Sequence, residues 1–356
     1  MASEIFERDR HVTFLQMEYQ LLPSAYQSQE INSLTLAYFV ISGLDLLAAP
    51  DRLVDKEAVA KWVLSLQAHP RSQSELDNGQ FYGFYGSRSA QFPSEDKDNG
   101  ALLSCSVSNL ASTYCAVAIL KIIGYDLSSI DSESILTSMR NLQQPDGSFM
   151  PIHTGAETDL RFIYCAGKTV KAFMELLFKP FNSIYLTIGH LSYDGKLEWH
   201  GQGESQGVHN KLPGGATYCG VTSLRLMGFI EEDILSKDAK SSIINVPLLL
   251  DWCLQRQAAD GGFQGRPNKP SDTCYAFWIG SVLKVLGGHK FIDKKALHGF
   301  LLTCQSEYGG FSKFPGDFPD LYHSYYGFTA FSLLEEPGLK PLCVELGMSA
   351  IAAIGI

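Results

Sequence analysis

The sequence predicts an all-α fold in which helical hairpins repeat and close into an α/α barrel (toroid). Three observations predict it: a glycine-rich motif recurs along the chain, an amphipathic segment precedes most copies, and a more uniformly apolar segment follows. No alternation of apolar and polar residues is long enough to indicate a sheet. We expect residues 1–356 to form a single domain.

The recurring motif has the form Asp-Gly-Gly-Phe. Its copies are residues 146–149 (DGSF), 260–263 (DGGF) and 308–311 (YGGF), with a weaker copy at 194–197 (DGKL). A glutamine usually stands a few residues before a copy, and a small signature of tyrosine and cysteine or of two tyrosines follows it. The period is roughly fifty residues and occurs about five times, which is typical of stacked helical hairpins.

One helix of each hairpin is expected to be amphipathic. Residues 55–67 (DKEAVAKWVLSLQ) and 131–143 (DSESILTSMRNLQ) place apolar side chains at helical spacing on one face. Asp131 is a suitable N-cap for the second of these helices. These segments predict outer helices that bury one face only.

The other helix of each hairpin is apolar around its whole circumference. Residues 111–123 and 275–286 show this pattern, and Gly124 and Gly287 follow where a terminating glycine belongs. These helices are expected to be inner ones, with the glycine-rich loops at one rim leading into their N-termini. An open helical solenoid that binds a protein would have the same period, and the site residues below favour the barrel.

Composition and charge exclude several classes of protein. The chain has 38 acidic and 28 basic side chains, and a net charge of −10 is unsuited to general binding of nucleic acid or anionic membranes. The eight cysteines are scattered without a CxxC pair, which is typical of a reduced cytoplasmic protein. We find no apolar leader and no apolar run approaching the ~18 residues of a membrane span.

Three possible zinc ligands stand at the entrances to two adjacent inner helices. Asp272 and Cys274 precede one helix, and His323 occupies the matching place in the next repeat. An aspartate, a cysteine and a histidine would leave the fourth position of a tetrahedral zinc open, as catalysis requires. A capping aspartate, a buried cysteine and a capped histidine would explain the same residues without a metal.

Basic residues lie just before these ligands. Arg266 and Lys269 precede Asp272, and Lys313 precedes His323. Cations beside helix N-termini, which carry partial positive charge, form an anion site. Cations on exposed loops are the alternative. Aromatic residues at the starts of the inner helices would line a cavity with apolar surface, although core packing uses the same spacing.

Residues 260–278 (DGGFQGRPNKPSDTCYAFW) and 308–327 (YGGFSKFPGDFPDLYHSYYG) resemble the β subunit of a protein prenyltransferase, most closely of the type I geranylgeranyl enzyme. The resemblance covers nearly the whole chain except residues 166–213. It implies an α/α barrel that forms a heterodimer with a helical-repeat α subunit and binds one catalytic zinc (Zn2+). It further implies transfer of an isoprenoid from its diphosphate to a cysteine near the C-terminus of a protein.

The resemblance also implies a set of site residues. These are the zinc ligands Asp272, Cys274 and His323; the diphosphate-binding Arg266, Lys269, Tyr275 and Lys313; the lipid-binding Thr35, Phe39, Arg161, Tyr164, Cys219 and Trp278; and the peptide-binding Tyr322.

Two features of the resemblance separate the subfamilies. Thr35 and Phe39 match the geranylgeranyl enzyme, whereas the farnesyl enzyme has bulky tryptophans there that shorten its lipid tunnel. Lys313 stands where the farnesyl enzyme has a magnesium-binding aspartate, so Mg2+ is not expected to be required. The implied substrates are geranylgeranyl diphosphate and C-terminal CaaX peptides ending in leucine, as on Rho-type small GTPases. A farnesyltransferase or a Rab-type geranylgeranyltransferase β subunit is the alternative.

The atypical segment 166–213 departs from the family. Pro213 stands where the family has a diphosphate-binding histidine, and His209, four residues upstream, is not assigned to that role. A splicing or gene-model variant and genuine divergence both explain the segment. A catalytically weakened chain that still binds the α subunit is therefore a further alternative.

Overall fold

The computed structural model describes residues 5–52, 55–70, 73, 82–91, 108–145, 147–153, 155–156, 158–173, 214–228, 230 and 244–354. The chain divides into two compact units. Unit 1 comprises Met1–His11 and Phe181–Gly347, and unit 2 comprises Val12–Pro180 and Met348–Ile356. Residues 174–213, which hold most of the atypical segment with His209 and Pro213, lie outside the described residues. The single domain over 1–356 stays a prediction.

Unit 2 is built from helical hairpins. Its main helices are α1 (Arg8–Gln20, whose start belongs to unit 1), α2 (Ser33–Leu46), α3 (Lys56–Leu64), α5 (Leu110–Ile122), α6 (Ser132–Arg140) and α7 (Leu160–Phe173). Short 3-10 turns are η1 (Ser24–Asn32), η2 (Pro50–Arg52), η3 (Ser89–Gln91) and η5 (Leu127–Ser129). Strand β1 (Gln67–Ala68) pairs antiparallel with β2 (Gly83–Phe84), and the C-terminal segment of the unit begins with β6 (Met348–Ser349).

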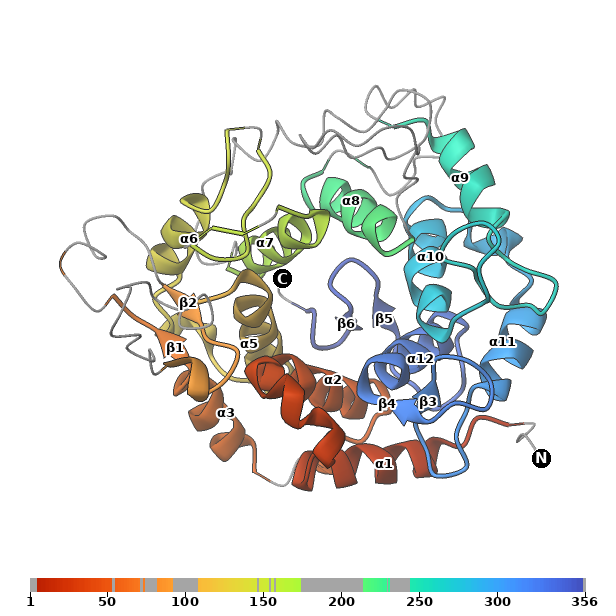
Figure 1. Cartoon of the computed structure of the whole chain (residues 1–356), viewed down its shortest axis with the longest axis horizontal. Coiled ribbons are helices and arrows are strands. Elements are labelled where there is room, and N and C mark those ends of the chain that lie inside the picture. The colour runs from red at the N-terminus through yellow and green to blue at the C-terminus, as the bar shows by residue number, and fades with distance from the viewer. Residues whose placement is uncertain are drawn as a thin grey trace. The chain divides into compact units, whose positions relative to one another are not determined.

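The helices of unit 2 form two layers. Helix α5 packs between α2 and α7, while α3 packs on α5 and α6 packs on α7 (Figure 1). Almost every residue of α2 and α5 is buried, whereas α3 and α6 bury one face. Asp55 and Asp131 cap the outer helices α3 and α6 by accepting bonds from Ala58 and Ser134 N–H groups. The predicted outer and inner helices of this unit are therefore confirmed.

Unit 1 repeats this arrangement. Its helices are α8 (Gly214–Leu226), α9 (Val246–Leu254), α10 (Thr273–Val285), α11 (Lys294–Thr303) and α12 (Leu321–Leu333), with the 3-10 turn η8 (His289–Phe291). Strand β3 (Phe311–Ser312) pairs antiparallel with β4 (Pro319–Asp320), and β5 (Leu342–Cys343) follows α12. Helix α10 packs between α8 and α12, with α9 against its outer side (Figure 1).

The glycine-rich motif forms the same turn in each described copy. In the copy at 260–263, Gly261 N–H donates to Ala258 O and Ala258 N–H donates to Gly262 O, both at 2.9 Å. The equivalent pair of bonds closes the copies at 146–149 and 308–311. Gly261 has φ +88°, and an added Cβ would lie 2.3 Å from Ala296 O, so only glycine fits. The turn explains why the motif recurs.

A buried histidine ties the N-terminal segment to the last of these turns. The His11 Nε2–H donates to Gln305 Oε1, and Nδ1 accepts from Gly310 N–H, both at 2.9 Å. The side chain is fully buried, and burial lowers the His11 pKa to about 4, against the opposing effect of the Gln305 hydrogen bond. The imidazole is therefore neutral and held in one tautomer at neutral pH.

Candidate metal centre

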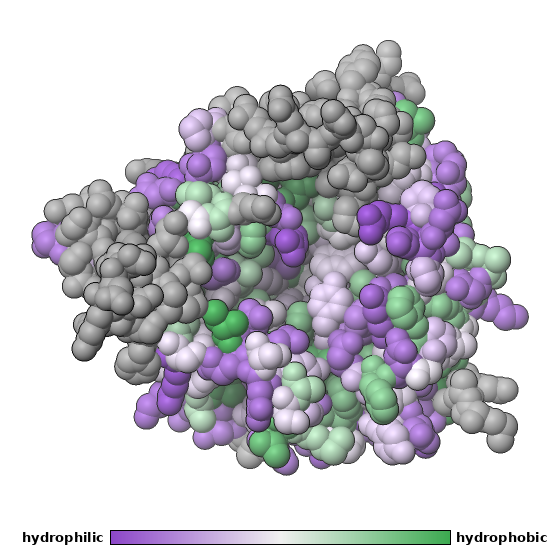
Figure 2. Space-filling view, viewed as in Figure 1, coloured by the Kyte–Doolittle hydropathy of each residue, from purple (hydrophilic) through white to green (hydrophobic). Residues whose placement is uncertain are grey.

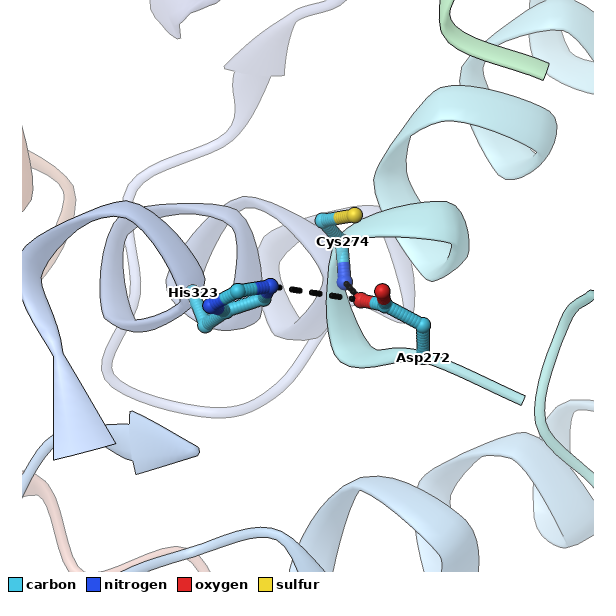
Figure 3. Close-up of side chains that lie close together, drawn as sticks. All are labelled: Asp272, Cys274 and His323. Atoms are coloured by element: carbon cyan, nitrogen blue, oxygen red, sulfur yellow. Dashed lines mark hydrogen bonds and ion pairs between the residues drawn. The ribbon is translucent and has the colours of Figure 1, made fainter. Parts of the chain in front are cut away.

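Asp272 and Cys274 are positioned by the start of helix α10. Asp272 is the N-cap residue, and its Oδ1 accepts a 2.9 Å bond from Cys274 N–H. The neighbouring repeat holds this helix start, because Thr273 Oγ1 donates to Ser312 O at 2.7 Å and Thr273 N–H donates to Lys313 O at 3.2 Å. Asp272 and Cys274 are both buried, and Figure 3 shows them at the start of α10.

His323 is positioned by the start of helix α12 and by Asp320. Asp320 is the N-cap residue: its Oδ1 accepts from His323 N–H at 2.8 Å, and its Oδ2 accepts from His323 Nδ1–H at 2.6 Å. The ring is thereby turned so that Nε2 lies 3.5 Å from Asp272 Oδ1 (Figure 3). A carboxylate that holds the far nitrogen of a metal-binding imidazole is a common supporting group.

Sequence reasoning did not assign a role to Asp320. The signal was present, because an aspartate three residues before a histidine at a helix start can cap the helix and reach the imidazole at once. The residue type alone could not distinguish this arrangement from an ordinary cap.

The three predicted ligands meet in one place. One donor atom from each of Asp272, Cys274 and His323 lies within 4.8 Å of the other two. Sulfur, imidazole nitrogen and carboxylate oxygen are the donors that zinc uses, and a set of three leaves one tetrahedral position open. The geometry therefore fits a zinc ion of the catalytic type. The Asp272 side chain is only 8% exposed and the His323 side chain only 12%.

The three groups shift one another's pKa values. Burial lowers the pKa of His323, but the hydrogen bonds to Asp272 and Asp320 outweigh it and raise the pKa to about 9. Burial raises the pKa of Asp272, and the hydrogen bonds from His323 and Cys274 reverse this to a net lowering. Burial and the Asp272 carboxylate raise the pKa of the Cys274 thiol well above its usual value. A bound cation would reverse the effect on the thiol.

Two aromatic side chains stand beside the sulfur. Trp278 Nε1–H donates to Tyr322 Oη at 3.3 Å, and both side chains oppose the rise of the Cys274 pKa. Tyr322 is 38% exposed and Trp278 is partly buried against Tyr326, with ring centroids 4.5 Å apart. The predicted lipid contact Trp278 and the predicted peptide contact Tyr322 therefore lie next to the predicted metal ligands.

The predicted diphosphate residues surround the same helix start. Arg266, Lys269 and Lys313 are exposed. On the face in Figure 2, hydrophilic and hydrophobic residues are mixed over the part of unit 1 that holds α10 and α11. Tyr275 packs on Gly265, where an added Cβ would lie 2.0 Å from the phenol ring. Burial raises the Tyr275 pKa, and the nearby Arg266 opposes that rise. These groups and the α10 N-terminus offer an anion a positive surface.

Comparison with known proteins identifies the family. The model of the prenyltransferase alpha-alpha toroid domain matches residues 6–348. The chain belongs to this prenyltransferase family. The α/α toroid predicted from the repeats is thereby confirmed, and the open solenoid is excluded. Among the described residues, we find no helix long and apolar enough to cross a membrane.

Relatives narrow the resemblance to one subfamily. The chain is 61% identical over 353 residues to the geranylgeranyl transferase type-1 subunit beta of Arabidopsis thaliana, covering 99% of this chain and 91% of the relative. It is 33% identical over 350 residues to the subunit of the same name from Dictyostelium discoideum, covering 96% and 94%. The predicted similarity to a type I prenyltransferase β subunit is confirmed.

A solved structure agrees in fold. The chain superposes on Candida albicans protein geranylgeranyltransferase-I, a structure complexed with geranylgeranyl diphosphate, with a TM-score of 0.76 at 22% identity. The match covers 98% of this chain and 97% of the other.

The remaining predicted lipid contacts of this prenyltransferase are divided between the units. In unit 2, Thr35 Oγ1 lies 3.8 Å from Cys115 Sγ, while Phe39 and Tyr164 are buried. Arg161 is exposed, and Asp159 holds its guanidinium in a 3.0 Å ion pair. In unit 1, Cys219 on α8 is buried. Their roles toward a lipid stay predictions.

Proposed function

We propose that this chain is the zinc-dependent catalytic β subunit of a type I protein geranylgeranyltransferase. It acts in a heterodimer with an α subunit and transfers geranylgeranyl from geranylgeranyl diphosphate to the cysteine of C-terminal CaaX sequences that end in leucine. The observation that carries the proposal is the buried Asp272, Cys274 and His323 cluster, in a chain 61% identical to a geranylgeranyl transferase β subunit.

The chain's residues prepare the acceptor cysteine. Asp272, Cys274 and His323 would hold the zinc, and Asp320 orients His323. Zinc bound there would lower the pKa of an acceptor thiol in the open position, so that a thiolate exists at neutral pH. In this proposal Tyr322, whose Oη accepts a hydrogen bond from Trp278, contacts the acceptor peptide.

The chain's cations prepare the donor. The acceptor sulfur bonds to C1 of geranylgeranyl diphosphate as the C1–O bond breaks, and the diphosphate leaves with the electron pair. Arg266, Lys269 and Lys313 stabilise the negative charge that develops on the leaving group, which is electrostatic rather than acid–base catalysis. Because the Lys313 ammonium supplies positive charge at this place, Mg2+ is not required.

The proposal is tested with the purified heterodimer and a peptide ending in Cys-aliphatic-aliphatic-Leu. We expect transfer from geranylgeranyl diphosphate and about one zinc per heterodimer. Cys274→Ala should lose the zinc and the transfer while the heterodimer stays assembled. The matched control is Cys253→Ala, which removes a buried thiol from α9, away from the cluster. Retention of zinc by Cys274→Ala would remove Cys274 from the ligand set.

A second candidate function is supported by the atypical segment. Pro213, in place of the family histidine, has neither a side-chain donor nor an N–H to offer a diphosphate. A catalytically weakened chain would still form the heterodimer and bind zinc, yet transfer little. Replacing residues 206–213 with one histidine, which restores the family order Glu-Ser-His-Gly-Gly, should then raise the rate. An equal rate before and after the repair would exclude this weakened form.

A further inference from the structure

Helix α7 carries a buried lysine between two tyrosine rings. Lys168 is 5% exposed, and its Nζ lies 3.9 Å from the ring centroid of Tyr114 on α5 and 4.0 Å from that of Tyr164 on α7. Lysine is rarely buried to this degree, and an ammonium over an aromatic face is held by the ring quadrupole. The two rings therefore form a half-cage for one positive charge, and the ammonium in turn fixes both rings.

This charge lies among the predicted lipid contacts of unit 2. Tyr164, one of those contacts, stacks directly on it, and Tyr114 is followed by Cys115, which contacts Thr35. Burial raises the pKa of the Cys115 thiol to about 12 and that of Cys165 to about 11, and in both cases the Lys168 ammonium opposes the rise. Lys168 is thus close to both thiols.

Lys168 also lies well inside its helix, away from the helix start. Arg161, at the start of α7, lies seven residues earlier, which corresponds to about 10 Å along the helix axis. Lys168 belongs to the part of the atypical segment 166–213 that the structure describes.

We propose that Lys168 weakens the binding of the isoprenoid hydrocarbon by occupying the faces of Tyr114 and Tyr164. The inference depends on the proposed function, because it assumes that Tyr164 contacts a prenyl chain. The ring faces stacked on the ammonium cannot also pack against isoprene, and a charged group offers the chain no apolar surface in exchange.

The test measures equilibrium binding of tritiated geranylgeranyl diphosphate and of the uncharged alcohol geranylgeraniol to the zinc-loaded heterodimer. Lys168→Met keeps the length of the side chain and removes the charge. We expect it to bind both ligands roughly tenfold more tightly, because part of an isoprene unit gains apolar contact. Lys168→Arg keeps a cation and should bind like the wild type. The control is Lys171→Met on the same helix, which is only half-buried.

Two outcomes would overturn the inference. Unchanged affinity of Lys168→Met for both ligands would show that the ammonium does not restrict the lipid. Weaker binding of the diphosphate alone would make Lys168 a diphosphate ligand instead. Should Lys168→Met fail to assemble, Lys168→Gln gives the same comparison. Transfer to the peptide is assayed separately, so a wild type that binds the lipid but transfers none refutes the proposed function, whatever the variants bind.

Discussion

Replacing Asp320 by asparagine separates its two roles at the start of α12. Its Oδ1 caps the helix by accepting from His323 N–H at 2.8 Å, while its Oδ2 accepts from His323 Nδ1–H at 2.6 Å. Asparagine has one oxygen, which can keep the cap, but its amide nitrogen cannot accept from the imidazole. Asp320→Asn should therefore leave the imidazole without its orienting acceptor and leave the helix cap in place.

The expected loss is in zinc affinity rather than in stability. Removing a group that orients a metal-binding histidine typically costs 10–100-fold in metal affinity, or about 1.4–2.7 kcal/mol. Asp320→Ala should lose the cap as well, at a further cost of about 1 kcal/mol in the free energy of unfolding. Asp293→Ala is the matched control, because Asp293 caps α11 by accepting from Ala296 N–H at 2.9 Å and lies outside the metal cluster.

The assay is competition for zinc between the heterodimer and a chelator of known affinity, together with urea unfolding of each variant. Because the Asp320 carboxylate also raises the His323 pKa to about 9, the titration is run above pH 9, where the imidazole is deprotonated and the proton no longer competes with zinc. If Asp320→Asn binds zinc as tightly as the wild type and Asp320→Ala behaves like Asp293→Ala, then Asp320 is only a helix cap and the reasoning fails.

Three further predictions concern the lipid, magnesium and pH. Thr35→Trp should shift the preference from geranylgeranyl to farnesyl diphosphate by up to about a thousandfold, because each carbon of the fourth isoprene unit is worth ~0.8 kcal/mol and the whole unit about 4 kcal/mol. Competition between the two diphosphates measures the shift, and an unchanged preference would place Thr35 away from the lipid end. Chelating magnesium should leave the rate of prenyl transfer by the wild type unchanged, whereas Lys313→Asp should create a magnesium requirement because it adds a carboxylate ligand. A wild type that loses activity without magnesium would contradict the proposal that the Lys313 ammonium replaces the metal. The His11 pKa of about 4 lies below its usual 6.5, so below pH 6.5 only the unfolded chain takes up the proton. The stability associated with His11 should be present above pH 6.5 and fall by about 3 kcal/mol as the pH falls through 4; urea unfolding at pH 7 and 4.5 measures this loss, and a His11→Gln variant with the same pH dependence would refute it.

The sequence by itself determined the elements and the membership of the metal cluster. Outer and inner helices follow from apolar spacing, and caps such as Asp55 and Asp131 act within three residues of their own position. The glycine-rich turns are local too, since both of their closing bonds join residues at most four positions apart. The repeat places Asp272 and His323 at the starts of equivalent helices in adjacent hairpins. Their closeness in space could therefore be predicted although they lie far apart in the chain.

Tertiary packing decided what the side chains do after the helices come together. In the sequence, Lys168 is one of several basic residues in predicted helices. Only the packing of α5 against α7 places its ammonium between Tyr114 and Tyr164. In the sequence, His11 is a polar residue near the N-terminus. Only the packing of the N-terminal segment on Gly310 makes it a buried, neutral imidazole. These outcomes depend on distances between residues remote in sequence, which periodicity and propensity do not encode. They depend equally on burial, which determines whether a charge is hydrated by water or held by its neighbours.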